Sequence, residues 1–431
     1  MSRPFRAARA LPACAAALAC LMTMVPAESK EKKPMKPTSK PAQDGAVRMT
    51  LLPALSSPLT AFRIQCRCGS INDPAGKEGL NALTAMTIGQ GGTRELTFRE
   101  LTDRLYPMAA TIQVQFDREV TIFAGEVHRD HLKAYYELLT GVLLRPRFDE
   151  SDFRRSRDVL MAGIETGLRG NDDEGLGKAA LSHLMYEGHP YRQPDAGTVQ
   201  GLKSITLDDV RAHYRKCYTQ GNVTLGVAGG YPEGMIESLK KDFAALPPGG
   251  PPRAALPKPR PLRGMEVLFV EKAAPAAAIS IGFPIGVTRA DRDFYALMLA
   301  NSYLGEHRTF NGRLMNKMRG ERGLNYGDYS YIENFIQDGG STFPLPNVAR
   351  RQQFFSIWIR PVAHANSLFA LRQAVRELKM LVDAGMSSSD FEATRKYVLN
   401  YSRLWTQDLS RRLGYRMDSE FYGIDSFIDR I

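Results

Sequence analysis

The densest group of residues that could do chemistry lies in residues 312–327, which read Gly-Arg-Leu-Met-Asn-Lys-Met-Arg-Gly-Glu-Arg-Gly-Leu-Asn-Tyr-Gly. The spacing of Leu314 and Met318 predicts a short helix that a glycine ends, and a strand is expected to begin at Tyr326. Arg319 and Tyr326 would then flank one turn, where both could donate hydrogen bonds to a backbone carbonyl. The alternative is a solvated arginine beside a packing tyrosine.

Other chemistries find less support in the sequence. His128 and His131 stand three apart at a helix start and could share a metal, but no further ligand lies nearby, so a surface or capping role is favoured. The sequence contains no G-x-S-x-G elbow, no G-x-G-x-x-G fingerprint and no Walker pattern. Hydrolase triads and nucleotide-phosphate loops are therefore not expected.

Three cysteines follow the N-terminal leader. Cys66 and Cys68 are two positions apart on a predicted strand and so share a face, where a disulfide between them would be strained. The favoured interpretation is that these two and Cys217 are small buried side chains.

Residues 1–27 have the pattern of a secretory signal peptide. Arg3, Arg6 and Arg9 precede an apolar stretch over residues 11–25 and small residues at 25–27. We therefore expect a periplasmic or secreted protein. Lipidation at Cys20 is the less favoured alternative, because apolar residues continue beyond it.

Residues 28–44 are rich in lysine and proline and are expected to be a disordered tether. The formal net charge is +11, and residues 1–44, with eight basic and three acidic residues, carry +5 of it. The remaining excess is small and includes no arginine-rich helix, so a nucleic-acid partner is not expected. No stable membrane span is expected after the leader.

Apolar periodicity alternates between periods of two and of 3.6 residues along the chain. Strands are expected at residues 47–52, 60–68, 112–115, 120–123, 223–228, 265–270, 278–283 and 355–360. Helices are expected at residues 80–88, 98–105, 131–144, 151–168, 181–186, 206–214, 235–245, 294–304, 368–382 and 390–405.

The chain reads as two similar halves. Ser151-Asp-Phe in the first half is matched by Ser389-Asp-Phe in the second, on corresponding predicted helices. We predict a domain over residues 45–247, a proline- and glycine-rich linker over 248–263 and a second domain over 264–431. Each is expected to be α+β, a largely antiparallel sheet with helices on one face. The second half lacks counterparts of the predicted helix 206–214 and strand 223–228. It is therefore either short by these elements or truncated, which would leave an open sheet edge.

The helix predicted at residues 80–88 offers little chemistry. It follows a turn at Asp73-Pro74 and is stopped by glycines, and its polar side chains are only Asn81, Thr84 and Thr87. A catalytic helix at this place would need metal ligands or a general base projecting from it.

Several motifs, in order over about residues 45–425, resemble the M16 family of insulinase, pitrilysin and mitochondrial processing peptidase. They are Asp73-Pro-x-Gly-Lys-Glu-Gly-Leu with Gly91-Gly-Thr, Arg145-Pro-x-Phe, Gly188-His-Pro-Tyr and Arg319-Gly-Glu-Arg-Gly-Leu-Asn-Tyr. The chain is most similar to the short bacterial two-domain members. The resemblance implies the M16 metallopeptidase-like, LuxS/MPP-like fold.

In that family the helix after Gly-Leu carries His-x-x-Glu-His, and a distant Glu is the third zinc ligand. The resemblance places the two His positions at Ala82 and Met86, the base position at Ala85 and the third ligand position at Gly163. Glu165 lies nearby but cannot rebuild a site alone. The resemblance thus implies the fold while these degenerate positions argue against zinc chemistry, so no catalytic residue, metal or cofactor is expected in this chain.

The family's Arg/Tyr pair resembles Arg319 and Tyr326 at the same spacing. In the family this pair binds the substrate backbone and helps stabilise the transition state. Some members are heterodimers in which one subunit carries the zinc and the other carries the Arg/Tyr pair. The expected function is therefore a non-catalytic, substrate-binding subunit whose partner carries zinc on His-x-x-Glu-His. The alternative is a structural or peptide-binding pseudo-peptidase. A self-sufficient zinc peptidase is disfavoured.

Overall fold

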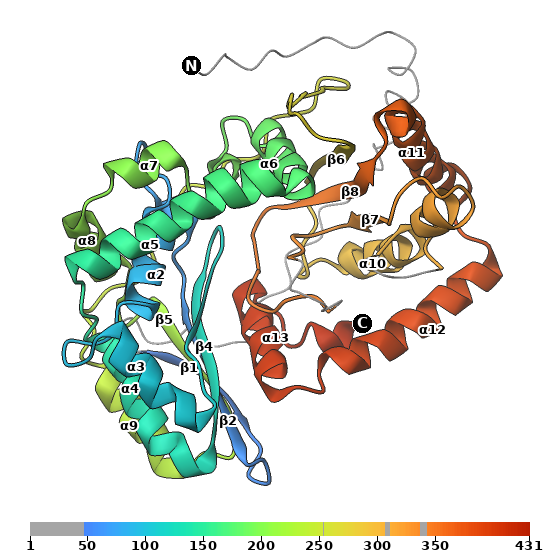
Figure 1. Ribbon diagram of the computed structural model, residues 1–431. Coiled ribbons are helices and arrows are strands. Elements are labelled where there is room, and N and C mark those ends of the chain that lie inside the picture. Colours follow the sequence, from blue (N-terminus) through green and yellow to red (C-terminus); the bar gives the residue numbers. More distant parts are fainter. Residues whose placement is uncertain (1–46, 253, 307–310, 337–342) are drawn as a thin grey trace.

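The computed structural model describes residues 47–252, 254–306, 311–336 and 343–431, and shows two α+β units side by side (Figure 1). The predicted fold class is confirmed: each unit has one sheet with helices packed on it. The predicted signal peptide and tether lie outside the described residues. None of the helices in the described ranges has the length and hydropathy needed to cross a membrane.

The first sheet has five strands in the order β1-β5-β2-β4-β3. All pairs are antiparallel except β1 with β5. Its strands are β1 (Arg48–Pro53), β2 (Leu59–Cys66), β3 (Gln113–Phe116), β4 (Thr121–His128) and β5 (Val223–Gly229). All seven residues of β5 are buried, as expected for a strand inside a sheet with both faces covered.

The helices of the first half are α2 (Leu80–Gly89), α3 (Phe98–Leu105), α4 (Leu132–Leu144), α5 (Glu150–Ala162), α6 (Asp173–Met185), α7 (Val199–Ser204), α8 (Leu207–Cys217) and α9 (Glu233–Phe243). Several of them, such as α4, α8 and α9, bury apolar residues on one face, while α2 is buried along its whole length. A π-helical segment, η4 (Gly163–Asn171), continues α5 toward α6. The predicted helix at 181–186 was too short, because α6 starts at Asp173, where the Asp172 carboxylate caps it.

The second sheet has three antiparallel strands in the order β6-β8-β7. They are β6 (Ala277–Ile285), β7 (Asp328–Tyr331) and β8 (Gln353–Val362). The helices of this half are α10 (Arg292–Leu304), α11 (Ser367–Ala384), α12 (Ser388–Trp405) and α13 (Leu409–Tyr422). One expectation was wrong, because residues 265–270 form no strand, and the helices α7 and α13 were not predicted.

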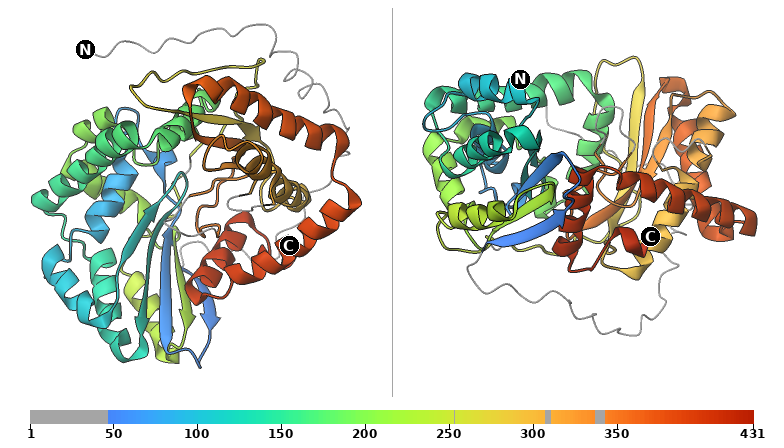
Figure 2. Two further views of the ribbon diagram at one scale, coloured as in Figure 1. Left: turned by 45° about the vertical axis from the view of Figure 1, so that its right-hand side comes forward. Right: turned by 90° about the horizontal axis from the view of Figure 1, so that it is seen from below.

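Each half sends one helix onto the sheet of the other half (Figures 1 and 2). Helix α6, from the first half, packs on β6 and β8, and α13, from the second half, packs on β1, β2 and β5. Leu413 and Met417 of α13 form one buried cluster with Ala61 of β2 and Ala228 of β5. Because neither half covers its own sheet completely, the two halves depend on each other for burial.

A buried ion pair joins the two halves beside these helices. The turn between β3 and β4 carries Asp117, whose carboxylate accepts two hydrogen bonds from the Arg350 guanidinium, one of them Nε–Oδ2 at 2.7 Å. Asp117 is 1% exposed and Arg350 4%. The bidentate geometry offsets the desolvation of both charges. Arg350 also lies 3.5 Å from Asp195 Oδ2, so the larger loss is expected when Arg350 is removed and the buried Asp117 carboxylate loses this partner.

We predict that Arg350→Ala lowers the free energy of unfolding by about 3–5 kcal/mol, because the Asp117 carboxylate would stay buried without its partner. The control is Arg154→Ala, which removes an exposed Arg154–Glu150 pair on α5 and is expected to cost about 1 kcal/mol or less. Urea unfolding followed by circular dichroism measures both. Equal losses in the two variants would contradict the view that Arg350 stabilises the protein as the buried partner of Asp117.

Candidate peptide-binding site

Arg319 and Tyr326 are placed by a short π-helical segment and the turn that follows it. Segment η6 (Met315–Gly320) buries Met318, and Gly323 then adopts a φ of +59° and donates from its N–H to the Arg319 carbonyl at 2.9 Å. A left-handed conformation of this kind favours glycine and ends the helix. The strand begins at Asp328, two residues later than predicted.

The structure brings Arg319 and Tyr326 together. The Arg319 guanidinium carbon lies 4.5 Å from the centroid of the Tyr326 ring, and Tyr326 is 67% exposed. The guanidinium carbon of Arg360, on β8, lies 5.4 Å from the same centroid. Two cations therefore flank one exposed aromatic ring, an arrangement worth about 0.5–1 kcal/mol per contact at such a site. Sequence reasoning missed Arg360, because it comes from a strand distant in the sequence.

The first half of the chain supports this cluster through α6. Arg360 Nε donates to Glu174 Oε2 at 3.0 Å, and Lys178 Nζ donates to Glu174 Oε1 at 2.7 Å. The Lys178 ammonium also lies 3.5 Å from the centroid of the Trp358 ring. A glutamate from one half thus fixes an arginine that flanks Tyr326 in the other. We refer to Arg319, Tyr326 and Arg360 as the clamp cluster.

A buried carboxyl group lies at the base of the clamp cluster. Asp328 is fully buried, and its Oδ1 accepts from Asn325 Nδ2 at 2.8 Å, while its Oδ2 has no hydrogen-bond partner among the described residues. Burial raises the pKa of Asp328 to about 7, and the hydrogen bond from Asn325 opposes this only in part.

Helix α2, which carries the expected zinc positions, is buried along its whole length. Ala82 and Met86 belong to one apolar cluster with residues of α5, η4 and α7, and Ala85 faces a second apolar cluster on the sheet side. The Asp73 carboxylate caps the helix, accepting from Gly79 N–H at 2.8 Å and Asn81 N–H at 2.7 Å. The side chains of this helix therefore serve packing, and the Asp73 carboxylate satisfies N–H groups at its N-terminus.

Gly163, the expected third ligand position, is the first residue of η4 and is exposed. A Cβ built there would meet no atom within 4 Å, and Ile164 beside it packs in the cluster that holds Ala82 and Met86. Two alanines and a glycine offer no side-chain donor, and a thioether is a poor zinc ligand. The residues present do not fit the zinc that the family resemblance implies.

The histidine pair and the cysteines have other roles. His128 ends β4 and accepts from the Asp130 N–H, which matches the expected capping role. Cys66, Cys68 and Cys217 are buried, as expected, and Cys66 is a free thiol. The disulfide that joins Cys68 to Cys217 across 149 residues was not expected. This pairing was missed because the meeting of the ends of β2 and α8 is a tertiary contact that sequence spacing does not encode.

His213 of α8 lies beside the disulfide, with its Nε2 3.4 Å from Cys217 Sγ and 3.6 Å from Cys68 Sγ. Because the two sulfurs are bonded to each other, they offer no thiolate ligands to a metal. His213 Nε2 lies 3.3 Å from Asn81 Oδ1 of α2, and Asn81 Nδ2 donates to Thr121 Oγ1 of β4 at 3.0 Å. Burial, with a smaller contribution from Lys216, lowers the pKa of His213 to about 4, so the imidazole is neutral. The network joins α2, α8 and the sheet, which is a structural role.

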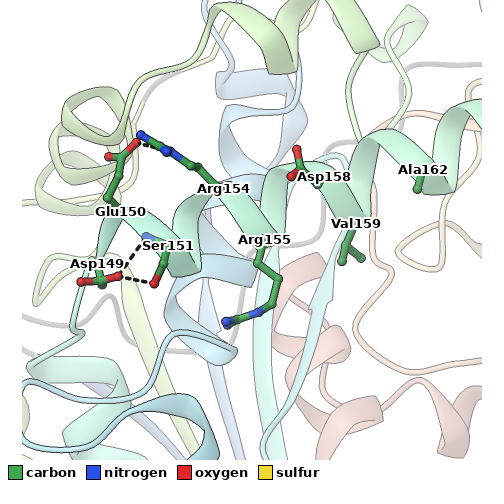
Figure 3. A pocket seen from close by; sticks show the side chains of 8 residues that line it. All are labelled: Asp149, Glu150, Ser151, Arg154, Arg155, Asp158, Val159 and Ala162. Atoms are coloured by element: carbon green, nitrogen blue, oxygen red, sulfur yellow. Dashed lines mark hydrogen bonds and ion pairs between the residues drawn. The ribbon is translucent and has the colours of Figure 1, made fainter.

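A shallow depression of about 800 Å³ lies on the outer face of α5 (Figure 3). Two pairs of its polar residues bond to each other: Arg154 Nε donates to Glu150 Oε1 at 2.9 Å, and Ser151 N–H donates to Asp149 Oδ1 at 2.9 Å. Arg155 bonds to Asp152 and to the Gln90 carbonyl. It contains neither the clamp cluster nor the α2 positions, and its groups do not converge on a ligand.

Comparisons with known proteins agree with the fold. The model described as insulinase (peptidase family M16) matches residues 52–193, and the one described as peptidase M16 inactive domain matches residues 204–398. A crystal structure of a peptidase M16 inactive domain from Pseudomonas fluorescens aligns with a TM-score of 0.72 at 20% identity, covering 89% of each chain.

Two relatives of this chain have names that state different functions. An uncharacterized zinc protease, YmxG of Bacillus subtilis, is 24% identical over 71% of this chain and 69% of its own length. A protein named non-peptidase homolog YmxG, of Helicobacter pylori, is 20% identical over 83% of this chain and 77% of its own length. The relatives therefore include both a named protease and a named non-peptidase.

We predict that Asp328→Asn becomes more stable relative to the wild type as pH rises from 4 to 8. The folded-state pKa of Asp328 is raised from 3.8 to about 7, so the native state binds more protons than the unfolded state in this window, and wild-type stability falls as pH rises through it. The neutral amide has no such dependence. The difference is expected to be on the order of 1–3 kcal/mol.

Urea unfolding at several pH values measures this difference. The control is Asp103→Asn, which neutralises an exposed carboxylate on α3 and should leave the pH profile unchanged. Parallel wild-type and Asp328→Asn profiles would show that the buried carboxyl is not protonated in the native state near pH 6.

Proposed function

We propose that this chain, which belongs to the M16 peptidase family, is the non-catalytic, substrate-binding subunit of an exported heterodimeric zinc peptidase. The observation that carries the proposal is the contrast between its two candidate sites. Ala82, Ala85 and Met86 are packed in apolar clusters, while Arg319 and Tyr326 lie against each other with the ring exposed.

The clamp cluster has the groups needed to hold an extended peptide. The Arg319 guanidinium carries several N–H donors and the Tyr326 hydroxyl one O–H donor, and a peptide carbonyl accepts from either. Donors fixed before the substrate arrives stabilise negative charge that develops on a carbonyl oxygen. The zinc ion and its activated water would come from a partner subunit that bears His-x-x-Glu-His.

The comparisons support a non-catalytic role without defining a partner. One relative over most of the chain is named a non-peptidase homolog. The inactive-domain model matches residues 204–398, which hold Arg319 and Tyr326 but none of the expected zinc positions. The name of the Bacillus subtilis relative points to zinc, but the residues at positions 82, 85, 86 and 163 of this chain offer no ligand set for it. Export rests on the signal-peptide pattern of residues 1–27.

A scaffold or peptide-binding pseudo-peptidase with no role in proteolysis is the second candidate. This candidate is favoured by the contacts that the clamp cluster makes within the chain itself. Arg319 stacks on Tyr326, and Arg360 donates a hydrogen bond to Glu174. Side chains that pair within the fold have a structural use that needs no substrate. The two candidates differ in whether Arg319 affects cleavage by a partner.

The test combines this protein with an M16 chain that carries His-x-x-Glu-His and is encoded beside it, and measures cleavage of a fluorogenic peptide. We expect the wild type to raise kcat/KM of the zinc chain, and Arg319→Ala to reduce that gain about a hundredfold, as for loss of one fixed donor to a developing charge. Arg322→Ala is the matched control, because Arg322 lies in the same turn and pairs with Glu321.

Unchanged kcat/KM with Arg319→Ala, while the two chains still associate, would establish the scaffold role instead. Failure of the chains to associate would reject the heterodimer. Size-exclusion chromatography of each mixture separates these two outcomes.

A further inference from the structure

Four side chains that can ligate a soft metal ion converge in one buried place between α2, α8 and the end of β2. They are Cys68, Asn81, His213 and Cys217, and none is more than 5% exposed. We refer to them as the Cys/His cluster. It is distinct from the clamp cluster, and it includes none of the positions on α2 and η4 where the family resemblance places zinc.

Helix α8 contributes two members of the cluster from its buried face. His213 and Cys217 are four residues apart, so their side chains lie on the same side of the helix. His213 Nε2 lies 3.4 Å from Cys217 Sγ and 3.6 Å from Cys68 Sγ. The three ligand atoms all lie within 4.8 Å of one another. The histidine thus faces both sulfurs at once.

These distances match those in a tetrahedral zinc site. With Zn–S bonds of about 2.3 Å and a Zn–N bond of about 2.0–2.1 Å, a histidine nitrogen lies about 3.5 Å from each thiolate sulfur. The two sulfurs would lie about 3.8 Å apart in such a site. Because they are bonded to each other in the structure, they would have to separate, and a change of χ1 in either cysteine moves its sulfur.

Asn81 of α2 supplies the fourth ligand position. Its Oδ1 lies 3.3 Å from His213 Nε2, close to the distance of about 3.4 Å between a nitrogen and an oxygen ligand on one tetrahedral zinc ion. The Asn81 Nδ2 donates to Thr121 Oγ1 at 3.0 Å. This bond fixes the orientation of the amide, so that its oxygen is directed to the histidine and the sulfurs.

The chemistry of the cluster favours zinc over harder cations. Thiolate and imidazole are preferred ligands of zinc, whereas magnesium and calcium prefer oxygen. Two thiolates would balance both charges of the ion. A neutral complex of this kind suits the surroundings, because Cys68 and Cys217 belong to the main apolar cluster of the first half.

Metal binding and the disulfide exclude each other. A dithiol reductant transfers two electrons and two protons to the disulfide, so the bond between Cys68 and Cys217 breaks while the reductant forms a disulfide of its own. A zinc ion then binds both cysteines as thiolates, and their two protons leave to solvent. Oxidation removes two electrons from the sulfurs, restores the bond between them and releases the ion.

We propose that the Cys/His cluster binds one zinc ion when its two cysteines are reduced, and that oxidation to the disulfide releases this ion. The ion joins α2, α8 and the end of β2, as the disulfide joins two of these segments. Four protein ligands leave no position open for water, so the site is structural. The inference is independent of the proposed function, because it uses neither the clamp cluster nor a partner subunit.

The test uses Co²⁺ as a spectroscopic probe in the full chain with Cys14→Ser and Cys20→Ser, which leaves three cysteines. The protein is reduced with a dithiol in urea, freed of the dithiol, and refolded without oxygen in the presence of Co²⁺. After gel filtration it should retain one Co²⁺ per chain, with thiolate charge-transfer absorption and the visible bands of a tetrahedral site. The same protein carried through without the dithiol should retain none.

Three variants in this background identify the ligands. Cys217→Ser and His213→Gln should each weaken Co²⁺ binding about tenfold or more, since loss of a group that only supports a ligand already costs that much. Cys66→Ser is the matched control, because Cys66 is a buried free thiol outside the cluster. It should retain one Co²⁺ with an unchanged spectrum. Circular dichroism checks that each variant folds.

A measurement without ligand variants keeps the test independent of how well they fold. Diamide, an azo compound that takes two electrons and two protons from two thiols, should release one zinc ion from the reduced, zinc-loaded protein for each disulfide formed. A chromophoric chelator detects the ion. Failure of the reduced protein to retain metal, equal retention by the oxidised protein, or a spectrum without thiolate charge transfer would overturn the proposal. So would loss of the signal in Cys66→Ser, or its persistence in a folded His213→Gln.

Discussion

Each sheet of this protein is covered by a helix from the other half, and most other features depend on that exchange. Helix α13 buries Leu413 and Met417 against Ala61 and Ala228 of the first sheet, and α6 covers β6 and β8 of the second. The buried pair between Asp117 and Arg350 fixes the two halves beside this exchange. Separation of the halves would expose two apolar sheet faces and two buried charges together.

The exchange also connects the two candidate sites. The chain passes from α5 through η4, which begins at the expected third-ligand position, directly into α6, which carries Glu174. Glu174 holds Arg360 beside Tyr326. The first half thus supports the clamp cluster structurally while its own helix α2 contributes only packing. In α2 the ligand positions have become part of apolar clusters, and burial of alanine and methionine there stabilises the fold.

The sequence predicted most elements, because apolar periodicity is strong in both halves, and it placed Arg319 and Tyr326 on one turn, as found. It could not predict contacts between residues distant in the chain. Arg360 beside Tyr326, the disulfide of Cys68 and Cys217, and the exchange of α6 and α13 all arise from tertiary packing. The error at residues 265–270 has the same origin, since a strand needs a neighbour that local pattern does not reveal.

We propose that this chain binds extended peptide through Arg319 and Tyr326 and needs no zinc to do so. Titration of a fluorescent unfolded peptide against the isolated protein, with and without EDTA, tests it most directly. The account predicts equal affinity in both conditions, weaker binding by Arg319→Ala, and an intact peptide after incubation. Loss of binding on chelation, or cleavage of the peptide by the isolated chain that EDTA abolishes, would contradict it.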